Sequence, residues 1–459
     1  MSPDGPPRPV GHGLPRPAAD GGPGPTPRPA PGRVFHVPGR IEVLGKHVDY
    51  AGGRSLLCAT SLGFTFEVRP TSDGRVRLRD RVSHQRTTIE VDPVHDGTGR
   101  GPVWSKYPRA VVRRVLGDFP EVGLVGCDIE FSSDVPSAAG LSSSSAFTTG
   151  VLLCLDAVSD VLDSDRARAA IPSLPDLADY VGAIESGRPF PGLQVEKAKG
   201  VGVRGGSQDH TAILCSRPGA LLQARFGPVE LERYVAMPSG LVFVIGVSGV
   251  RASKAAGARA RYNRLSDLAT RIAELWRADT GSSEPHLGAI LDTGPDASAR
   301  LRGILERDGW EDAAAMIRRV EQFRVETREL VPGVVEALER EDLDALGEKV
   351  AMSQRLAETH LGNQVPETVH LAESAREAGA IAASAFGAGF GGAVWALVDE
   401  GRVESFVNAW GAAYRTAFPR RSSRARFVVT RPSDPAGPLP ERFRSRRFPA
   451  APGSATPPG

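Results

Sequence analysis

The chain has 459 residues, which exceeds the usual size of one hydrophobic core and predicts two domains or one large two-lobed fold. Hydrophobic residues make up 41% and charged residues 24%, the values of an ordinary soluble globular protein. The net charge is only +2, with acids and bases interspersed, which argues against nucleic acid or an anionic membrane as the principal partner.

Both ends of the chain have a composition unlike the middle. The first 32 residues contain eleven prolines and lack the apolar centre of a signal peptide, so we expect a disordered tail over 1–32. Residues 432–459 are rich in Pro, Arg and Gly and are expected to form a second disordered tail outside the fold. No run of eighteen apolar residues occurs, so no membrane span is expected.

Strands and helices alternate between the tails. The first half predicts strands at 63–69, 75–79, 87–91 and 127–135, and helices at 103–116, 146–158 and 175–186. The second half predicts strands at 241–247, 381–386, 393–398 and 425–429, and helices at 256–276, 311–330, 343–361, 366–378 and 403–417. No repeat period is visible, and this mixture indicates an α+β fold.

A run of serines stands where the strand 127–135 gives way to a helix. Residues 136–146 read PSAAGLSSSSA, so the serines lie where a helix N-terminus exposes unpaired backbone N–H groups. Such an end attracts phosphate. Plain helix capping by serine is the alternative interpretation.

Two more glycine-rich motifs lie far from the serine run. Residues 38–53 read PGRIEVLGKHVDYAGG, and residues 387–392 read GAGFGG, for which a simple strand-to-strand turn is the alternative. The three motifs in this order resemble those of the GHMP small-molecule kinases, and the first resembles the signature of galactokinases. The resemblance implies a two-lobed α+β fold, in which an N-terminal lobe over 33–235 has a left-handed crossover and binds nucleotide and sugar. It implies a ferredoxin-like C-terminal lobe over 236–431, with the site between the lobes.

The resemblance also assigns residues to ATP. A tryptophan and a tyrosine of WSKY, Trp104 and Tyr107, resemble the pair that galactokinases place beside the adenine. The phosphates would be bound by the backbone of the serine loop and of the third motif, through Pro136, Gly140, Leu141, Ser142, Ser143, Ser144, Ser145, Gly387, Gly389 and Gly391. The loop is not a Walker A loop, because no GKS or GKT follows a glycine.

The resemblance implies a magnesium ion as well. Ser144 matches the serine that ligates the ion, and Glu185, at the end of LADYVGAIE, resembles the family's metal carboxylate. A hard cation of this kind takes few protein oxygens, so one carboxylate suffices. Glu196 is the alternative ligand, and an exposed salt bridge is the alternative role of Glu185.

The turn GGSQDH resembles the family's catalytic loop, with His210 where galactokinases usually have Gln. Asp209 is then the group that takes the sugar proton or orients the sugar hydroxyl, although an Asp that caps a turn is the alternative. Arg40 would lie beside it, hold Asp209 ionised and offset charge on the phosphoryl group. The alternative for Arg40 is a solvated side chain at the protein surface, which is usual for an Arg in a Gly-Arg turn.

Sugar binding is assigned to residues of the first motif and of two later segments. His47 and Asp49 match residues that bind sugar hydroxyls in galactokinases, and Tyr50, Gly206 and Tyr262 complete the predicted pocket. Two positions depart from the family, which usually has Asn at Glu42 and Glu at Lys46. An ammonium at Lys46 suggests an anionic sugar such as galacturonate. The alternative is a Lys46 side chain in solvent that pairs with Glu42.

We therefore expect an enzyme that transfers the γ-phosphoryl group of ATP to the anomeric hydroxyl of galactose or a related monosaccharide. The competing interpretations are a kinase for an anionic sugar, a galactokinase-like sensor without catalysis, and a kinase for a non-sugar alcohol. The expected partners are the sugar and ATP, and the protein itself is expected to be a monomer or a homodimer. The four cysteines lie far apart without metal spacing and are interpreted as reduced core thiols, which fits the cytoplasm.

Overall fold

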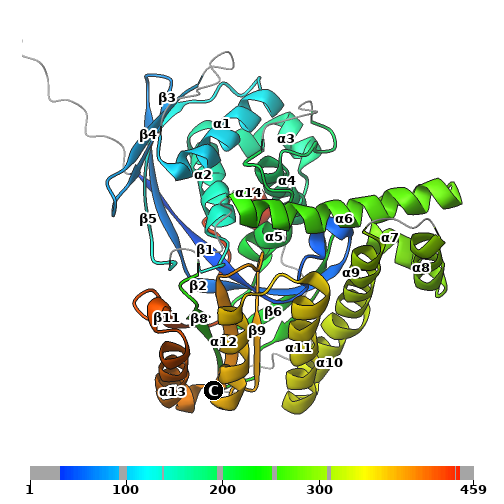
Figure 1. The fold of residues 1–459 in the computed structure, drawn as a ribbon. Helices are drawn as coiled ribbons and strands as arrows, with labels where there is room; N and C mark the ends of the chain where they lie inside the picture. The colour runs from blue at the N-terminus through cyan, green and yellow to red at the C-terminus, as the bar shows by residue number, and fades with distance from the viewer. Residues whose placement is uncertain are drawn as a thin grey trace, which may run out of the picture. The chain divides into compact units, whose positions relative to one another are not determined.

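The computed structural model describes residues 32–91, 101–136, 139–193, 200–250, 256–307, 312–439 and 441–444, all within one compact unit (Figure 1). The predicted tail before residue 32 lies outside the described residues, as does most of the predicted tail after 432. Two separate β-sheets organise the described part of the chain.

The first sheet contains seven strands from the first half of the chain: β1 (Arg33–Leu44), β2 (Arg54–Thr71), β3 (Arg75–Asp80), β4 (Arg86–Glu90), β5 (Gly126–Ser133), β6 (Ala220–Arg225) and β7 (Glu230–Ala236). Their order is β4-β3-β5-β2-β6-β7, and β1 pairs with β2. Neighbours are antiparallel except β3 and β5, which are parallel. The sheet confirms the predicted strands of the first half and adds β1, β6 and β7.

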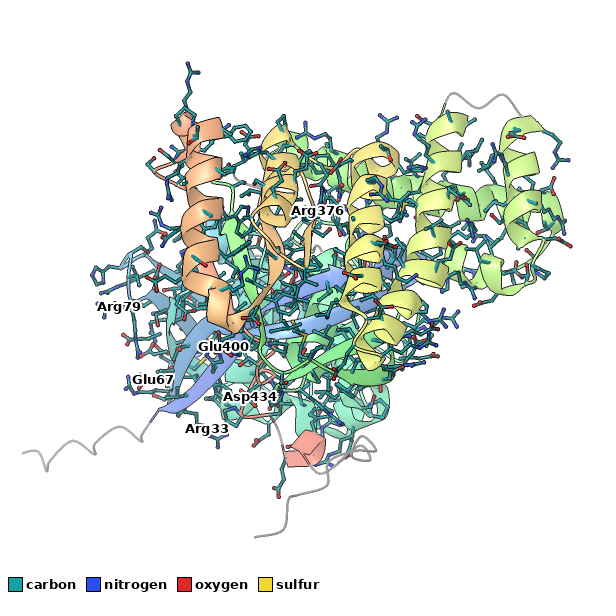
Figure 2. All side chains as sticks on the ribbon, turned by 90° about the horizontal axis from the view of Figure 1, so that it is seen from below. Arg33, Glu67, Arg79, Arg376, Glu400 and Asp434 are labelled. Carbon is teal, nitrogen blue, oxygen red and sulfur yellow. The ribbon has the colours of Figure 1, made fainter. Side chains whose placement is uncertain are left out.

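One face of this sheet is apolar and carries the helices. In β2, Phe66 and Val68 are buried while Glu67 between them faces the other side, because side chains alternate along a strand. The outer face carries ion pairs, for example Arg81 with Glu67, and Figure 2 labels Glu67 and Arg79 on it. The helices of this half are α1 (Lys106–Asp118), α2 (Ser143–Ser159), α3 (Asp165–Ala170), α4 (Leu174–Ser186) and α5 (Gln208–Cys215). Among them α1, α2, α4 and α5 share one core with the inner face.

The second sheet contains four strands: β8 (Leu241–Val247), β9 (Ala382–Ala385), β10 (Ala393–Asp399) and β11 (Arg426–Thr430). Their order is β11-β8-β10-β9 and every neighbouring pair is antiparallel. The helices α12 (Pro366–Glu377) and α13 (Val403–Ala417) precede β9 and β11 and pack on one face. This βαββαβ order is that of a ferredoxin-like lobe, as the sequence predicts.

Helices fill the long connection between β8 and β9. They are α6 (Ala256–Thr280), α7 (Leu287–Asp292), α8 (Ala297–Arg307), α9 (Ala313–Val325), α10 (Val331–Glu339) and α11 (Leu343–Leu356), with π-helical turns at Glu326–Leu330 and Ala357–Leu361. The first π turn comes just before Pro332, which lacks the N–H that an α-helical bond would need. Helices α6 to α9 share a hydrophobic cluster with Val48 and Ala51 of the first motif.

A single hydrophobic cluster connects the two sheets. Ile41 of β1 and Cys58 of β2 belong to the same cluster as Ile245 of β8 and Trp395 of β10. The change from one sheet to the other falls between β7 and β8, close to our boundary at 235, and the exact limits of the two lobes stay a prediction. Because this core is shared, the position of the first motif is determined by both halves of the chain.

Part of the predicted C-terminal tail is packed in the structure. The amide of Gly437 donates to the carbonyl of His36 and the reverse bond also forms, both at 2.9 Å. Phe443, in the short helix α14 (Glu441–Arg444), is buried in the core of the first sheet. Figure 2 labels Asp434 in this segment. The prediction that the fold ends at 431 is therefore wrong for the described residues 432–439 and 441–444. Their Pro-rich composition is typical of a disordered tail, so these contacts are not predictable from it.

The four cysteines are free and buried, which agrees with the interpretation as core thiols. Burial raises the pKa of Cys58 to about 12, so its thiol is protonated at neutral pH. Within the described residues, none of the helices is both long and apolar enough to cross a membrane.

Candidate active site

The helix α2 begins inside the serine run, as the sequence predicts. Ser142 is its N-cap and adopts a left-handed backbone with φ of 56°, and Gly140 before it has φ of 74°. The turn exposes the first backbone N–H groups of α2, from Ser143 onward, which have no acceptor inside the helix. This is the geometry of an anion-binding helix end.

The third motif lies against this turn. A Cβ atom added to Gly387 would stand 3.2 Å from the carbonyl oxygen of Gly140 and 3.3 Å from Nη2 of Arg40. A Cβ atom on Gly389 would collide with the carbonyl oxygen of Asn363, at 2.3 Å, and both glycines have positive φ. Gly391 also has positive φ, of 124°. The glycines therefore let the second half of the chain approach the serine turn and Arg40 closely.

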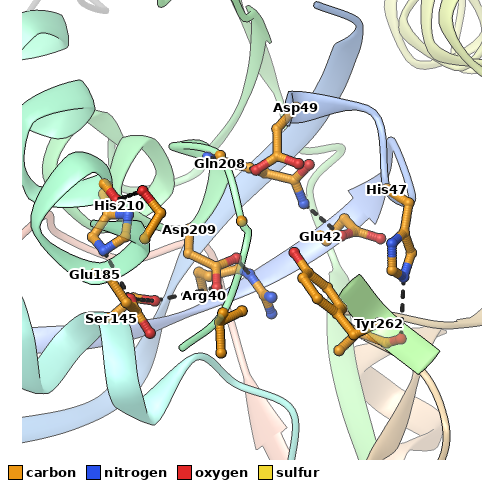
Figure 3. A pocket seen from close by; sticks show the side chains of 17 residues that line it. Arg40, Glu42, His47, Asp49, Ser145, Glu185, Gln208, Asp209, His210 and Tyr262 are labelled. Carbon is orange, nitrogen blue, oxygen red and sulfur yellow. Dashed lines mark hydrogen bonds and ion pairs between the residues drawn. The ribbon is translucent and has the colours of Figure 1, made fainter. Parts of the chain in front are cut away.

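One pocket collects most of the predicted catalytic and sugar-binding residues (Figure 3). It holds about 600 Å³, including the part open to solvent. Of the predicted site, Arg40, His47, Asp49, Ser145, Glu185, Gly206, Asp209, Tyr262 and Gly387 line it. These residues come from β1, α2, α4, α5, α6 and three loops, so only the folded chain assembles them.

Asp209 and Arg40 form an ion pair in this pocket. Nε of Arg40 donates to Oδ1 of Asp209 at 2.6 Å, and Nη1 of Arg40 donates to the carbonyl of Gly140 at 2.7 Å. Burial opposes ionisation of Asp209, but the charge of Arg40, together with hydrogen bonds to the carboxylate and the charge of His210, outweighs it and lowers the pKa of Asp209. Asp209 is therefore a carboxylate at neutral pH. Arg40 connects it to the serine turn.

Glu185 lies beside Ser145, the residue after the predicted magnesium ligand Ser144. The hydroxyl of Ser145 is 2.8 Å from Oε2 of Glu185 and 3.3 Å from Oδ2 of Asp209, and Nε2 of His210 is 3.1 Å from Oε2 of Glu185. Glu185 is buried, so the alternative of an exposed salt bridge is wrong. The other alternative, Glu196, lies outside the described residues. In the described part of the chain, no three or more His, Cys, Asp or Glu side chains gather as a metal centre.

His47 is held in one orientation by two hydrogen bonds. Its Nδ1 accepts from the hydroxyl of Tyr50 at 2.9 Å, and its Nε2 donates to the carbonyl of Ala388 at 3.1 Å. Burial lowers the pKa of His47 to about 3, and the nearby charge of Arg319 adds to this, so the ring is neutral. The hydroxyl of Tyr50 therefore orients the ring of His47. Tyr50 itself, which was predicted to be part of the pocket, does not line it.

Asp49 and Tyr262, for which sugar binding is predicted, line the same pocket as His47. Oδ2 of Asp49 accepts from the amide of Gln208 at 3.3 Å, and burial, together with the charge of Asp209, raises the pKa of Asp49. A Cβ on Gly206 would clash with the Asp49 carboxylate, which explains the glycine there. The ring of Tyr262 lies 5.0 Å from that of His47, between centroids.

Lys46 is not in the pocket, which corrects both interpretations of this residue. Its side chain is 1% exposed, so it does not reach solvent. Its Nζ donates to the hydroxyl of Ser353 at 2.8 Å, and its amide is held by Glu326, which also accepts from Gly45 and Ser353. The ammonium thus anchors the first motif to α11 and is not available to bind an anionic group on the sugar.

Three buried polar side chains of the pocket were not among the predicted site residues. Glu42, Gln208 and His210 all line the pocket and are buried. The departures from the galactokinase pattern at 42 and 210 are the sequence signal that could have identified two of them. For Gln208 the signal is its place in the GGSQDH turn, directly before Asp209, and it reaches the pocket because α5 begins there.

Trp104 and Tyr107 lie near the serine turn but outside this pocket. Trp104 is in a 3₁₀ turn (Val103–Ser105) and Tyr107 in α1, and the rings of both contact Phe147 of α2, with centroids 5.8 and 6.4 Å from it. Phe147 follows the serine run by two residues. Both aromatic side chains therefore stand beside the N-terminal turn of α2, and their contact with adenine stays a prediction.

Comparison with known proteins matches three family descriptions. They are "GHMP kinases N terminal domain" over 106–217, "GHMP kinases C terminal" over 334–416 and "Galactokinase galactose-binding signature" over 27–70. A galactokinase of Exiguobacterium sibiricum is 28% identical over 83% of this chain and 88% of its own length. A galactokinase of Streptomyces coelicolor is 27% identical over 84% of this chain and 90% of its own.

The fold is also that of solved kinases. The structure of Lactococcus lactis galactokinase complexed with galactose matches with a TM-score of 0.69, at 23% identity, over 89% of this chain and 95% of that one. Mevalonate kinase of Methanococcus jannaschii matches with a TM-score of 0.52, at 14% identity, over 89% and 100%. With both conserved domains and the signature motif matched in order, the chain belongs to the GHMP kinase superfamily and carries the galactokinase signature.

Proposed function

We propose that this protein is an ATP-dependent galactose kinase, which transfers the γ-phosphoryl group to the anomeric hydroxyl and releases a sugar 1-phosphate. The observation that carries the proposal is one pocket that is lined by Asp209, by Ser145 of the serine turn, and by His47 and Asp49 of the first motif. Relatives named galactokinase, each aligned over more than four-fifths of this chain, support galactose as the acceptor.

The serine turn is the site proposed for the nucleotide phosphates. The N–H groups that begin α2 and the close approach of Gly387 to Gly140 leave room for phosphate oxygens where a side chain would intrude. The adenine would lie toward Trp104 and Tyr107, at the outer side of the same turn. Magnesium, when bound, would neutralise charge on the phosphates, and Glu185 with Ser144 are its proposed ligands.

Asp209 is the proposed catalytic residue. Its lowered pKa makes it a good hydrogen-bond acceptor but a weak base, so it orients the anomeric hydroxyl and takes the proton late, as the phosphoryl group transfers. Arg40 holds the carboxylate at 2.6 Å and places a fixed positive charge between it and the serine turn. That charge offsets negative charge on the transferring group.

The charges of the pocket favour galactose over a uronate. Four carboxyl groups line it, those of Glu42, Asp49, Glu185 and Asp209, against the single guanidinium of Arg40. His47 is neutral and Lys46 is directed elsewhere. A carboxylate on the sugar would meet like charges in a partly buried site, which costs several kcal/mol at an effective dielectric of about 20.

The test is a turnover screen of the full chain with ATP, magnesium and a panel of free sugars. We expect ADP release with galactose and a sugar 1-phosphate identified by phosphorus NMR, with galacturonate turned over at least about tenfold more slowly. Binding of galactose and ATP without any ADP release would replace the proposal with a sensor. Turnover of mevalonate or homoserine in place of sugars would replace it with a non-sugar kinase.

A further inference from the structure

We propose that Glu42 is a specificity-determining residue of the sugar pocket, whose second carboxyl oxygen accepts a hydrogen bond from a hydroxyl of an uncharged sugar. This inference rests on the proposed function and deepens it. The galactokinases that the first motif resembles usually have Asn at this position, so Glu42 gives this pocket an acceptor of its own.

Glu42 reaches the pocket because of its register in β1. It stands two residues after Arg40, and residues two apart in a strand point to the same face. Both side chains line the pocket, and Figure 3 shows Glu42 between Gln208 and His47. The residue is 2% exposed, so its carboxyl group is not in bulk water.

One oxygen of Glu42 is bound and the other is free. Nε2 of Gln208 donates to Oε2, while Oε1 is buried and has no hydrogen-bond partner among the described residues. Burial of an acceptor without a partner destabilises the protein, because the hydrogen bond that the oxygen made to water is not replaced. A sugar hydroxyl in the pocket would remove that cost, and this gives the bound state a contact that the free protein lacks.

The position of the free oxygen is fixed through Gln208. The hydroxyl of Ser55 in β2 donates to Oε1 of Gln208 at 2.8 Å, which determines which end of the amide faces Glu42. The backbone amide of Gln208 donates to Asp49, so one residue orients both carboxyl groups. Glu42 is therefore held by three elements, β1, β2 and α5, and is preorganised before the sugar binds.

Asp49 and Glu42 then divide the recognition of the sugar. Asp49 matches a residue that binds sugar hydroxyls in galactokinases. Gln208 lies between Asp49 and Glu42 and donates to both, through its backbone amide and its side chain respectively. Two carboxyl groups toward one ligand suit a polyhydroxyl sugar, whose hydroxyls donate, and not a substrate with an anionic group. The substrate class is therefore a neutral monosaccharide with a hydroxyl donor opposite Glu42.

The test compares galactose with its 2-, 3-, 4- and 6-deoxy forms in the wild type and in Glu42→Gln. At pH 8, where Glu42 is mostly ionised, we expect one deoxy sugar to lose about 10- to 100-fold in kcat/KM in the wild type, as for a hydrogen bond to a charged group. In Glu42→Gln the penalty for that same sugar should fall to a few-fold while the other penalties stay unchanged. Glu42→Asn, the residue usual in galactokinases, provides a second variant if Gln impairs folding.

The matched control is Asp156→Asn, which makes the same carboxyl-to-amide change at a buried group in α2 that does not line the pocket. It should keep the wild-type pattern of penalties. Equal penalties for every deoxy sugar in the wild type and both Glu42 variants would overturn the inference. If the wild type turns over no sugar, the kinase proposal fails, and the same comparison of dissociation constants by calorimetry decides on Glu42.

Discussion

Replacing Glu42 by Gln should stabilise the protein above neutral pH and leave it unchanged in acid. Burial raises the pKa of Glu42 from the usual 4.5 to about 7, although Arg40, Lys46 and the bond from Gln208 oppose the rise, and Asp209 adds to it. The folded state therefore holds a proton that the unfolded chain has released between these two values. Stability is lost as the pH rises from about 4.5 to about 7.

The size of the effect follows from the shift. A difference of about 2.5 units between the two pKa values corresponds to about 3 kcal/mol at 1.36 kcal/mol per unit. Glutamine has the same shape and no charge, so it resembles the protonated glutamic acid at every pH. The advantage of Glu42→Gln over the wild type should be under about 1 kcal/mol at pH 5 and about 3 kcal/mol at pH 8.

Urea denaturation at pH 5, 6, 7 and 8, followed by tryptophan fluorescence, measures this difference. Comparing variant and wild type at each pH cancels the titration of all other groups. A stability difference that stays constant from pH 5 to pH 8 would refute the reasoning, because it would mean that Glu42 ionises in the folded protein as it does in water.

Three further predictions concern catalysis and the motifs. Asp209→Asn should lower kcat by about 10²- to 10⁴-fold with little change in ATP affinity, measured by steady-state ADP release and nucleotide titration. Gly387→Ala should lose activity, since its Cβ would press toward Gly140. Gly74 has a similar positive φ but lies in open space, so Gly74→Ala should lose only about 1–2 kcal/mol of stability. Full activity of the Gly387 variant would contradict the close approach. Lys46→Met should keep the preference for galactose over galacturonate, because the ammonium is outside the pocket; a reversed preference would show that it contacts the sugar.

Periodic segments of the fold were predictable, and irregular ones were not. The helix 403–417 is found with the predicted bounds, because its apolar face repeats at helical spacing. The strand β1 was not predicted, because Pro38 and Gly39 interrupt its pattern; its register shifts between Pro38 and Arg40. Helix α10 was missed because Pro332 at its start suggests a break, whereas the helix continues through a π turn.

The catalytic side of the site was easier to predict than the sugar side. Arg40 and Asp209 belong to short motifs with fixed roles, and the structure brings them within 2.6 Å. The direction of Lys46 depends on Ser353, 307 residues away, so no local pattern could show that it points out of the pocket. Glu42 and Gln208 are 166 residues apart, so their pairing is likewise not visible in any local pattern.

The C-terminal segment has a consequence for how the protein is made. Gly437 pairs with β1 and Phe443 packs in the core of the first sheet. The first half of the chain can therefore complete its packing only after this C-terminal segment has been synthesised. While the ribosome translates the second half, the edge at His36 and the apolar surface under Phe443 stay uncovered. Shortening the chain after Thr430 should therefore destabilise the sheet and core around β1, near the start of the described residues.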